Sequence, residues 1–249
     1  MLVLASASPR RRELLTQAGF TFQVHPAHIP EDPHPNEDPV AYVVRLAREK
    51  AEAVFNQLAL KGHDFSSADR DPKEVRALAP EGSSSDPSTI LGAPGLDSET
   101  WDSNNPDPQS LTVLGADTTV VLDNQILGKP ESPEDAARML RLPSGRTHRV
   151  ITGVSLVSAT QTQNQAQIRT QIQTQVAAEV TAVEFLTLSE QEIADYIATG
   201  EPNDKAVAYA IQGRAARWIP RIEGCYFNVV GLPIALVSTL LDSITQTEP

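Results

Sequence analysis

Several features are scarce or missing in this 249-residue chain, and each scarcity narrows the class of protein. A single cysteine, Cys225, rules out an internal disulfide and favours a reducing, cytoplasmic environment. No run of about 18 apolar residues occurs, so no transmembrane helix is predicted. The first apolar stretch is short and precedes the arginines at 10–12, which is not the order found in a signal peptide.

Basic residues are also scarce: the chain has 20 Lys and Arg residues against 32 Asp and Glu residues, which gives a net charge of −12. This charge argues against a general nucleic-acid surface, which would be basic, and nothing indicates a membrane partner. It does not exclude a small anionic ligand, since a local basic pocket can oppose the overall field.

Two segments differ in composition from the rest. Residues 62–110 hold six Pro, four Gly and nine Ser, with ten acidic residues against three basic ones. We predict a long, mostly irregular acidic insertion in one domain spanning 1–249, with Trp101 as a local anchor. The Thr- and Gln-rich segment 158–175 predicts an extended polar hairpin, because strand-like runs flank it.

The remaining sequence alternates between strand and helix patterns, which predicts an α/β protein with mixed strand connections. A capping box at 189–192 opens a helix that Gly200 ends, and an Asp-Asn turn at 123–124 joins two strands. Strands are expected at 2–6, 20–24, 111–123 and 125–129, and helices at 9–18, 37–59, 132–142 and after Pro233.

The stretch LASASPRRREL (4–14) places three arginines at a predicted helix start, with Ser8 as cap. Cations there destabilise a helix by roughly 0.3–1 kcal/mol each. The free N–H groups and positive dipole of the same helix end bind anions, so the cluster suits a polyphosphate. We favour Arg10 as phosphate ligand, leave Arg11 open and interpret Arg12 as solvated, with Ser6 and Ser8 as hydroxyl donors.

The stretch LGADTTVVLDNQILGKP places Asp117 inside a buried strand. A buried carboxylate is costly unless it is paired or metal-bound. We favour a metal ligand or general base at a kink in the strand over the alternative, a carboxylate that caps a bulge. Lys129 follows the next strand and would reach the same anion, although GKP lacks the spacing of a phosphate-binding P-loop.

The stretch GEPNDKAVAYAIQG (200–213) ends an apolar, strand-like run at Gln212. An amide offers both a donor and an acceptor, which suits the edge of a planar base. A Gln212 side chain that only satisfies the turn backbone is an equal alternative. His25, His28 and His34 share a proline-rich loop without the spacing of metal ligands.

Taken together, these stretches resemble the Maf family of nucleoside triphosphate pyrophosphatases. The resemblance implies an elongated mixed sheet with flanking helices and two lobes around a central cleft. It also implies hydrolysis of a nucleoside triphosphate to monophosphate and pyrophosphate, with dTTP and UTP as substrates of this branch. The matching motifs are SASPRRREL (6–14), RLAREKA (45–51), GADTTVVLDNQILGKP (115–130), SGRTHRVITGVSL (144–156), GEPNDKAVAYAIQG (200–213) and IEGCYFNVVGLP.

The resemblance assigns roles to individual positions. Asp117 matches the proton acceptor, and with Glu31 it would hold a divalent cation, Mg²⁺ or Mn²⁺. Positions linked to substrate choice match Arg10, Thr118 and Gln212, and basic residues facing the phosphates match Lys50 and Lys129. Ser8 is expected beside them.

This chain departs from the family pattern at three positions. Pro30 stands where the family has Asp, and Val207 and Ala210 stand where it has Gly. We expect the last two to add bulk beside the base pocket. Two other functions remain open: a non-catalytic, nucleotide-binding regulator of septum formation, and a house-cleaning enzyme for modified nucleotides. A homodimer is an open alternative to a monomer.

Overall fold

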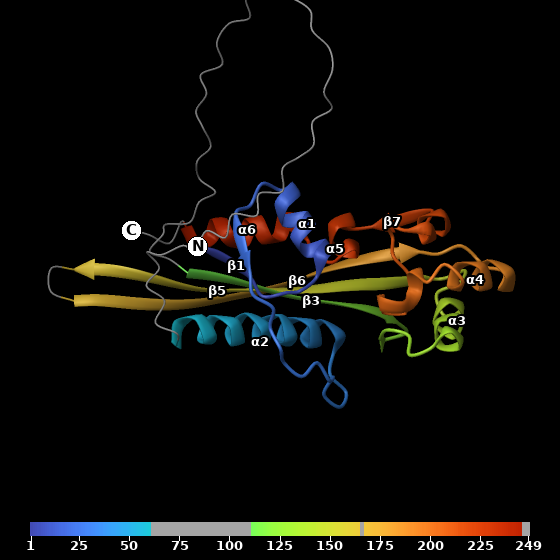
Figure 1. Ribbon diagram of the computed structural model, residues 1–249, viewed down its shortest axis with the longest axis horizontal. Coiled ribbons are helices and arrows are strands. Elements are labelled where there is room, and N and C mark those ends of the chain that lie inside the picture. The colour runs from blue at the N-terminus through green and yellow to red at the C-terminus, as the bar shows by residue number, and fades with distance from the viewer. Residues whose placement is uncertain (61–110, 165–166, 246–249) are drawn as a thin grey trace, which may run out of the picture.

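A seven-stranded mixed sheet organises the protein, as Figure 1 shows. The computed structural model describes residues 1–60, 111–164 and 167–245; the predicted insertion at 62–110, with Trp101, lies outside them. The predicted α/β class with an elongated mixed sheet is confirmed. The strands are β1 (Leu2–Leu4), β2 (Phe22–Val24), β3 (Leu111–Leu122), β4 (Gln125–Leu127), β5 (Thr147–Asn164), β6 (Gln167–Glu184) and β7 (Arg221–Glu223).

The strand order is β2-β1-β3-β5-β6-β7, with β4 paired to β3. β1 runs parallel to β2 and β3, and the other pairs are antiparallel. β5 and β6 pair from Thr147–Glu184 to Asn164–Gln167, which confirms the predicted hairpin. In Figure 1 this hairpin extends past the other strands at one end of the sheet.

Helix α2 (Pro39–Leu60) covers one face of the sheet over β3 and β5. Its sequence predicts one apolar face of six residues, of which Val43, Ala47, Ala51 and Val54 are buried and Val40 and Val44 are half-buried. Gly115 and Gly153 allow a close approach, because a Cβ on Gly115 would lie 2.8 Å from the Ala51 nitrogen. The helix backbone therefore lies almost directly on the two central strands.

Helices α1 (Pro9–Gln17), α5 (Tyr226–Val230) and α6 (Ile234–Thr245) cover the opposite face, and α3 (Pro133–Arg141) and α4 (Glu190–Ile197) lie at one end (Figure 1). The predicted capping box at α4 is present, and the Ser132 hydroxyl accepts from the Asp135 N–H at the start of α3. Gly200 follows α4 at φ 74°, a conformation that suits glycine. These predicted helix boundaries are confirmed within one or two residues.

Two local predictions are wrong. Asp117 does not lie at a kink or bulge, since β3 and β5 pair without interruption and Asp117 opposes Gly153. No strand precedes Gln212, because Val207 and Ala208 have φ values of 54° and 58°, which a strand cannot contain. The chain there forms three short 3₁₀ helices, η1 (Glu201–Asp204), η2 (Ala206–Ala208) and η3 (Arg214–Trp218). Among the described helices, none is long and apolar enough to cross a membrane.

Candidate active site

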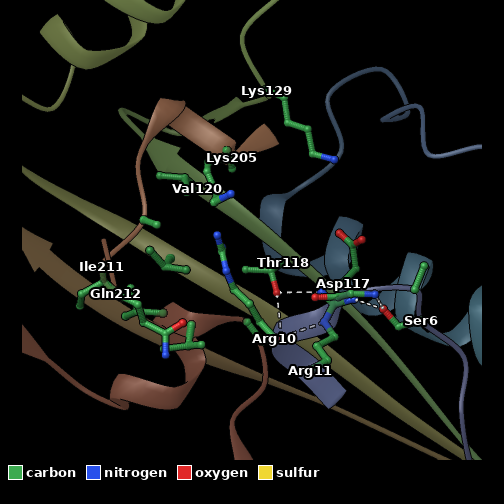
Figure 2. A pocket seen from close by; sticks show the side chains of 18 of the residues that line it. Ser6, Arg10, Arg11, Asp117, Thr118, Val120, Lys129, Lys205, Ile211 and Gln212 are labelled. Carbon is green, nitrogen blue, oxygen red and sulfur yellow. Dashed lines mark hydrogen bonds between the residues drawn. The ribbon is translucent and has the colours of Figure 1, made fainter. Parts of the chain in front are cut away.

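A pocket of about 500 Å³ opens between the N-terminal loop, β3 and the segment 205–212. Figure 2 shows Asp117 and Ser6 on one side of it and Gln212 and Ile211 on the other, with the Arg10 side chain between them. Distant parts of the sequence therefore meet in one cavity. All the predicted site residues line it: Ser8, Arg10, Glu31, Lys50, Asp117, Thr118, Lys129 and Gln212.

Lys50 joins the two predicted metal-binding carboxylates. Its Nζ lies 2.7 Å from Asp117 Oδ1 and 2.6 Å from Glu31 Oε1. Lys50 and Asp117 are buried, whereas the Glu31 side chain is 58% exposed. Burial raises the pKa of the Asp117 carboxyl above its usual value, and the charges of Lys50 and Arg11 act in the opposite direction.

The close approach of α2 to the sheet delivers Lys50 to Asp117. Lys50 precedes Ala51, whose backbone nitrogen faces Gly115, and Asp117 is two residues further along the same strand face. A larger side chain at Gly115 or Gly153 would hold the helix away from the strands. These glycines thus serve the site as well as the fold.

Arg11, which the sequence left open, is a structural centre of the pocket rather than a solvated side chain. Its Nε donates to the Gly231 carbonyl (2.9 Å), and its Nη1 donates to the Ala116 carbonyl (2.9 Å) and to Ser6 Oγ (3.0 Å). Its Nη2 donates to Thr118 Oγ1 at 3.1 Å. Burial lowers the pKa of the guanidinium, and the nearby carboxylates oppose that effect. One side chain therefore ties the N-terminal loop to β3 and to the C-terminal segment.

Thr118 belongs to the same network. Its hydroxyl also lies 2.9 Å from that of Thr152 on β5, and 3.3 Å from the Gly231 carbonyl. Hydrogen bonds with Arg11 of α1 and with Thr152 of β5 therefore fix the Thr118 side chain beside Asp117.

The other cations extend into the cavity. Arg10, Lys129 and Lys205 join Arg11 and Lys50 in its lining, against the two carboxylates. Five cations and two carboxylates make this pocket locally positive in a chain of net charge −12. Lys205 was not among the predicted site residues, although it belongs to the motif GEPNDKAVAYAIQG (200–213), where it follows Asp204 as an adjacent charge pair.

Ser8 occupies the cap position of α1, as predicted, but its side chain makes no capping hydrogen bond. Ser8 is one of the residues that line the pocket. Arg12 is exposed on α1, in agreement with its interpretation as a solvated residue.

Apolar side chains also line the pocket, namely Val120, Val150, Ala210, Ile211 and Val229. Ile211 lies beside Gln212, on the side of the pocket opposite Asp117 (Figure 2). The expectation that Val207 adds bulk there is wrong, because Val207 is fully buried in a core cluster with α3 and α4. Ala210 does line the pocket, so only one of the two departures from glycine faces it.

The donor set suits one divalent cation held together with substrate. No group of three His, Cys, Asp or Glu side chains is arranged to hold a metal in the part of the chain that the structure describes. Asp117 and Glu31, however, converge on one point, the Lys50 ammonium. Mg²⁺ in phosphate-processing sites is commonly bound by one or two carboxylates and substrate oxygens, so these two residues fit such an ion.

Comparison with known proteins gives a consistent result. The family described as "Maf-like protein" matches residues 1–244. A protein of Koribacter versatilis named "dTTP/UTP pyrophosphatase" is 42% identical over 96% of this chain and 92% of its own length. Proteins with the same name are 40% identical in Geobacillus sp. (94% of this chain and 92% of theirs) and in Shewanella denitrificans (99% and 97%).

Proposed function

Because this chain belongs to the Maf family, we propose that it is a nucleoside triphosphate pyrophosphatase that hydrolyses dTTP and UTP to the monophosphate and pyrophosphate. The observation that carries the proposal is the pocket itself, which combines a buried carboxylate and five cations with Gln212 and Ile211 on the side opposite Asp117. One end suits a triphosphate and the other a base. The names of the relatives support the same activity.

The reaction needs a base, an oriented substrate and stabilisation of the leaving group. Asp117 would accept a proton from water as the water oxygen attacks the α-phosphorus. The bond from that phosphorus to the bridging oxygen then breaks, and its electron pair leaves with pyrophosphate. Arg10, Lys129 and Lys205 would offset the charge that develops on the departing oxygens.

A divalent cation, Mg²⁺ or Mn²⁺, would be held by Asp117 and Glu31, and it would supply further charge neutralisation at the phosphates. Lys50 now contacts both carboxylates, at 2.7 and 2.6 Å. The Lys50 ammonium would hold the carboxylates of Asp117 and Glu31 together before the substrate binds. The same ammonium would contact a phosphate group that is bound beside these carboxylates.

The base would lie against the apolar end of the pocket. Gln212 offers one donor and one acceptor to the edge of a pyrimidine, and Ala210 limits the room beside it. We assign Gln212 to substrate choice together with Arg10 and Thr118, which line the same pocket. This assignment favours a pyrimidine over the larger purine.

The test is pyrophosphate release across a panel of nucleoside triphosphates, with and without Mg²⁺. Asp117→Asn should lower turnover by roughly 10²–10⁴-fold, the usual contribution of a general base, and leave the folded state intact. Asp123→Asn is a matched control, because Asp123 lies in an exposed turn and pairs with Arg146. Near-normal turnover by Asp117→Asn, or no preference for pyrimidine substrates in the native protein, would contradict the proposal.

We also propose that the protein forms a homodimer through β6 and acts in the cytoplasm. Among the described strands, β7 pairs with β6 only over Ala182–Glu184, so the rest of β6 is an edge. Residues 170–178 carry no charge, and Ile172, Val176 and Val180 are 60%, 44% and 41% exposed on one face. An uncharged edge strand is a template for pairing. Antiparallel self-pairing centred on Val176 would set Ile172 against Val180 of a second copy.

Sedimentation of the full chain tests the dimer. Val176→Lys should convert it to a monomer, because a charge at the two-fold axis would meet its own copy. Thr16→Lys, an exposed substitution on α1, is the control. A monomeric native protein, or a Val176→Lys variant that remains dimeric, would contradict the pairing.

A further inference from the structure

A buried polar pair joins the pocket wall to the sheet: Tyr209 lines the pocket next to Ala210, and His148 contacts it from outside the lining. His148 on β5 is 2% exposed, and its Nε2 lies 2.6 Å from the hydroxyl of Tyr209, which is 6% exposed. The two rings meet edge to face at 5.5 Å, and Phe185 packs against Tyr209 at 5.0 Å. Phe185 and Tyr209 belong to one apolar core cluster, and the His148 ring lies against both of them, 5.8 Å from Phe185 between ring centroids.

This arrangement costs stability. The Nδ1 of His148 has no hydrogen-bond partner among the described residues. In either neutral tautomer one ring nitrogen is therefore buried without a partner, at a cost of about 1–3 kcal/mol. Burial also lowers the pKa of His148 to about 4, so the imidazole is neutral at neutral pH. Two phenylalanines would fill the same space without that cost.

The backbone next to the pair explains what it holds. Tyr209 follows Val207 and Ala208, two residues other than glycine at positive φ, and a β-branched residue such as Val207 is strained there. Strained backbone persists only when its surroundings fix it. The side chains of Val207 and Ala208 are fully buried. The hydroxyl of Tyr209 adds one directional hydrogen bond, to His148 on strand β5 of the sheet. Tyr209 lines the pocket together with the next three residues, Ala210, Ile211 and Gln212.

We propose that His148 is a positioning residue that holds Tyr209 and, through it, sets the place of the 210–212 backbone for the nucleobase. This inference rests on the proposed function, because it takes the Gln212 end as the base site. His148 is not among the residues that line the pocket, and its ring nitrogen is hydrogen-bonded to Tyr209. Its removal should therefore affect recognition of the base and not that of the phosphates.

Two ligands separate these effects: UMP, which carries a base, and inorganic pyrophosphate, which does not. In His148→Phe and Tyr209→Phe the dissociation constant for UMP should rise about tenfold, as expected for the loss of one buried hydrogen bond. The dissociation constant for pyrophosphate should change less than about twofold, which corresponds to under half a kcal/mol. In turnover, KM for UTP should rise by the same factor as the UMP constant while kcat holds.

Two further variants exclude a general weakening of the core. His148→Gln keeps a polar atom near the Nε2 position and should restore UMP binding. Phe185→Leu removes packing from the same cluster without touching the polar pair, so it should lower the melting temperature and leave the ratio of the two dissociation constants unchanged. The melting temperature of every variant accompanies the binding data.

The inference is overturned by equal losses for both ligands, by unchanged UMP binding in His148→Phe, or by a His148→Gln variant that behaves like His148→Phe. A shift of the ratio in Phe185→Leu that matches His148→Phe would overturn it as well. Calorimetry with UMP and pyrophosphate does not depend on turnover. A native protein that releases no pyrophosphate would thus refute the proposed function without deciding the role of His148.

Discussion

A methyl group added at Gly115 should lower activity by moving helix α2, and with it Lys50, away from Asp117. The new Cβ would lie 2.8 Å from the Ala51 nitrogen and still closer to the Ala47 carbonyl, whereas ordinary contact begins at 3.4 Å. Helix α2 must then retreat by at least about 0.6 Å, because backbone atoms cannot rotate away as a side chain can. Lys50 moves with the helix, and a misplacement of about 1 Å near a reacting centre costs on the order of 10²-fold in rate.

We therefore expect Gly115→Ala to lower kcat/KM for UTP by about 10- to 100-fold and the free energy of unfolding by about 1–3 kcal/mol, the usual cost of overpacking. Pyrophosphate release and urea denaturation measure the two quantities. Gly128→Ala is the matched control, since its Cβ would meet nothing within 4 Å. Native kcat/KM in a folded Gly115→Ala protein would refute the claim that the close approach of α2 positions Lys50.

Three other perturbations test separate parts of the site. Lys50 lowers the pKa of Asp117, so Lys50→Met should move the acidic limb of the kcat/KM profile to higher pH; an unmoved limb contradicts the coupling. Arg11→Lys cannot bridge the same partners and should lose about 2 kcal/mol in urea unfolding, while a loss below about 0.5 kcal/mol would show that the network is dispensable. His148 has a pKa of about 4 in the folded state against 6.5 in the unfolded state, so the unfolded chain binds the extra proton between those values. Stability should then fall by up to about 3 kcal/mol as pH drops from 6.5 to 4, and His148→Phe should lack this loss.

Local sequence patterns predicted most of the fold. Helix α2 shows a repeating apolar face, α3 and α4 begin at serine caps, and the Asp-Asn turn between β3 and β4 has both residues at positive φ. Each of these signals acts within a few residues, which is why a single sequence reveals it. The incorrect strand before Gln212 has the same origin, because an apolar run does not show that Val207 and Ala208 leave the strand conformation.

The site was predictable in part for a different reason. Asp117 and Arg10 are conspicuous because a charge in a buried strand and a cation at a helix start are both unfavourable without a ligand or partner. Arg11 was not distinguishable from its neighbours, since its acceptors are carbonyls at Ala116 and Gly231, more than 100 residues away. The residues next to Arg11 in the sequence do not indicate such long-range contacts. The three consecutive arginines therefore do not show which of them is buried.

The acidic segment of the sequence joins α2, which carries Lys50, to β3, which carries the proposed base Asp117, since α2 ends at Leu60 and β3 begins at Leu111. Ten helical residues separate Leu60 from Lys50, a span of about 15 Å, and six strand residues separate Leu111 from Asp117, about 20 Å. Chain length between Leu60 and Leu111 can therefore change while Lys50 and Asp117 stay where α2 and the sheet hold them, because doubling the length of a connection costs only about 0.6 kcal/mol of closure entropy. The same junction offers a place to splice in a reporter domain or affinity tag without rebuilding the enzyme around it.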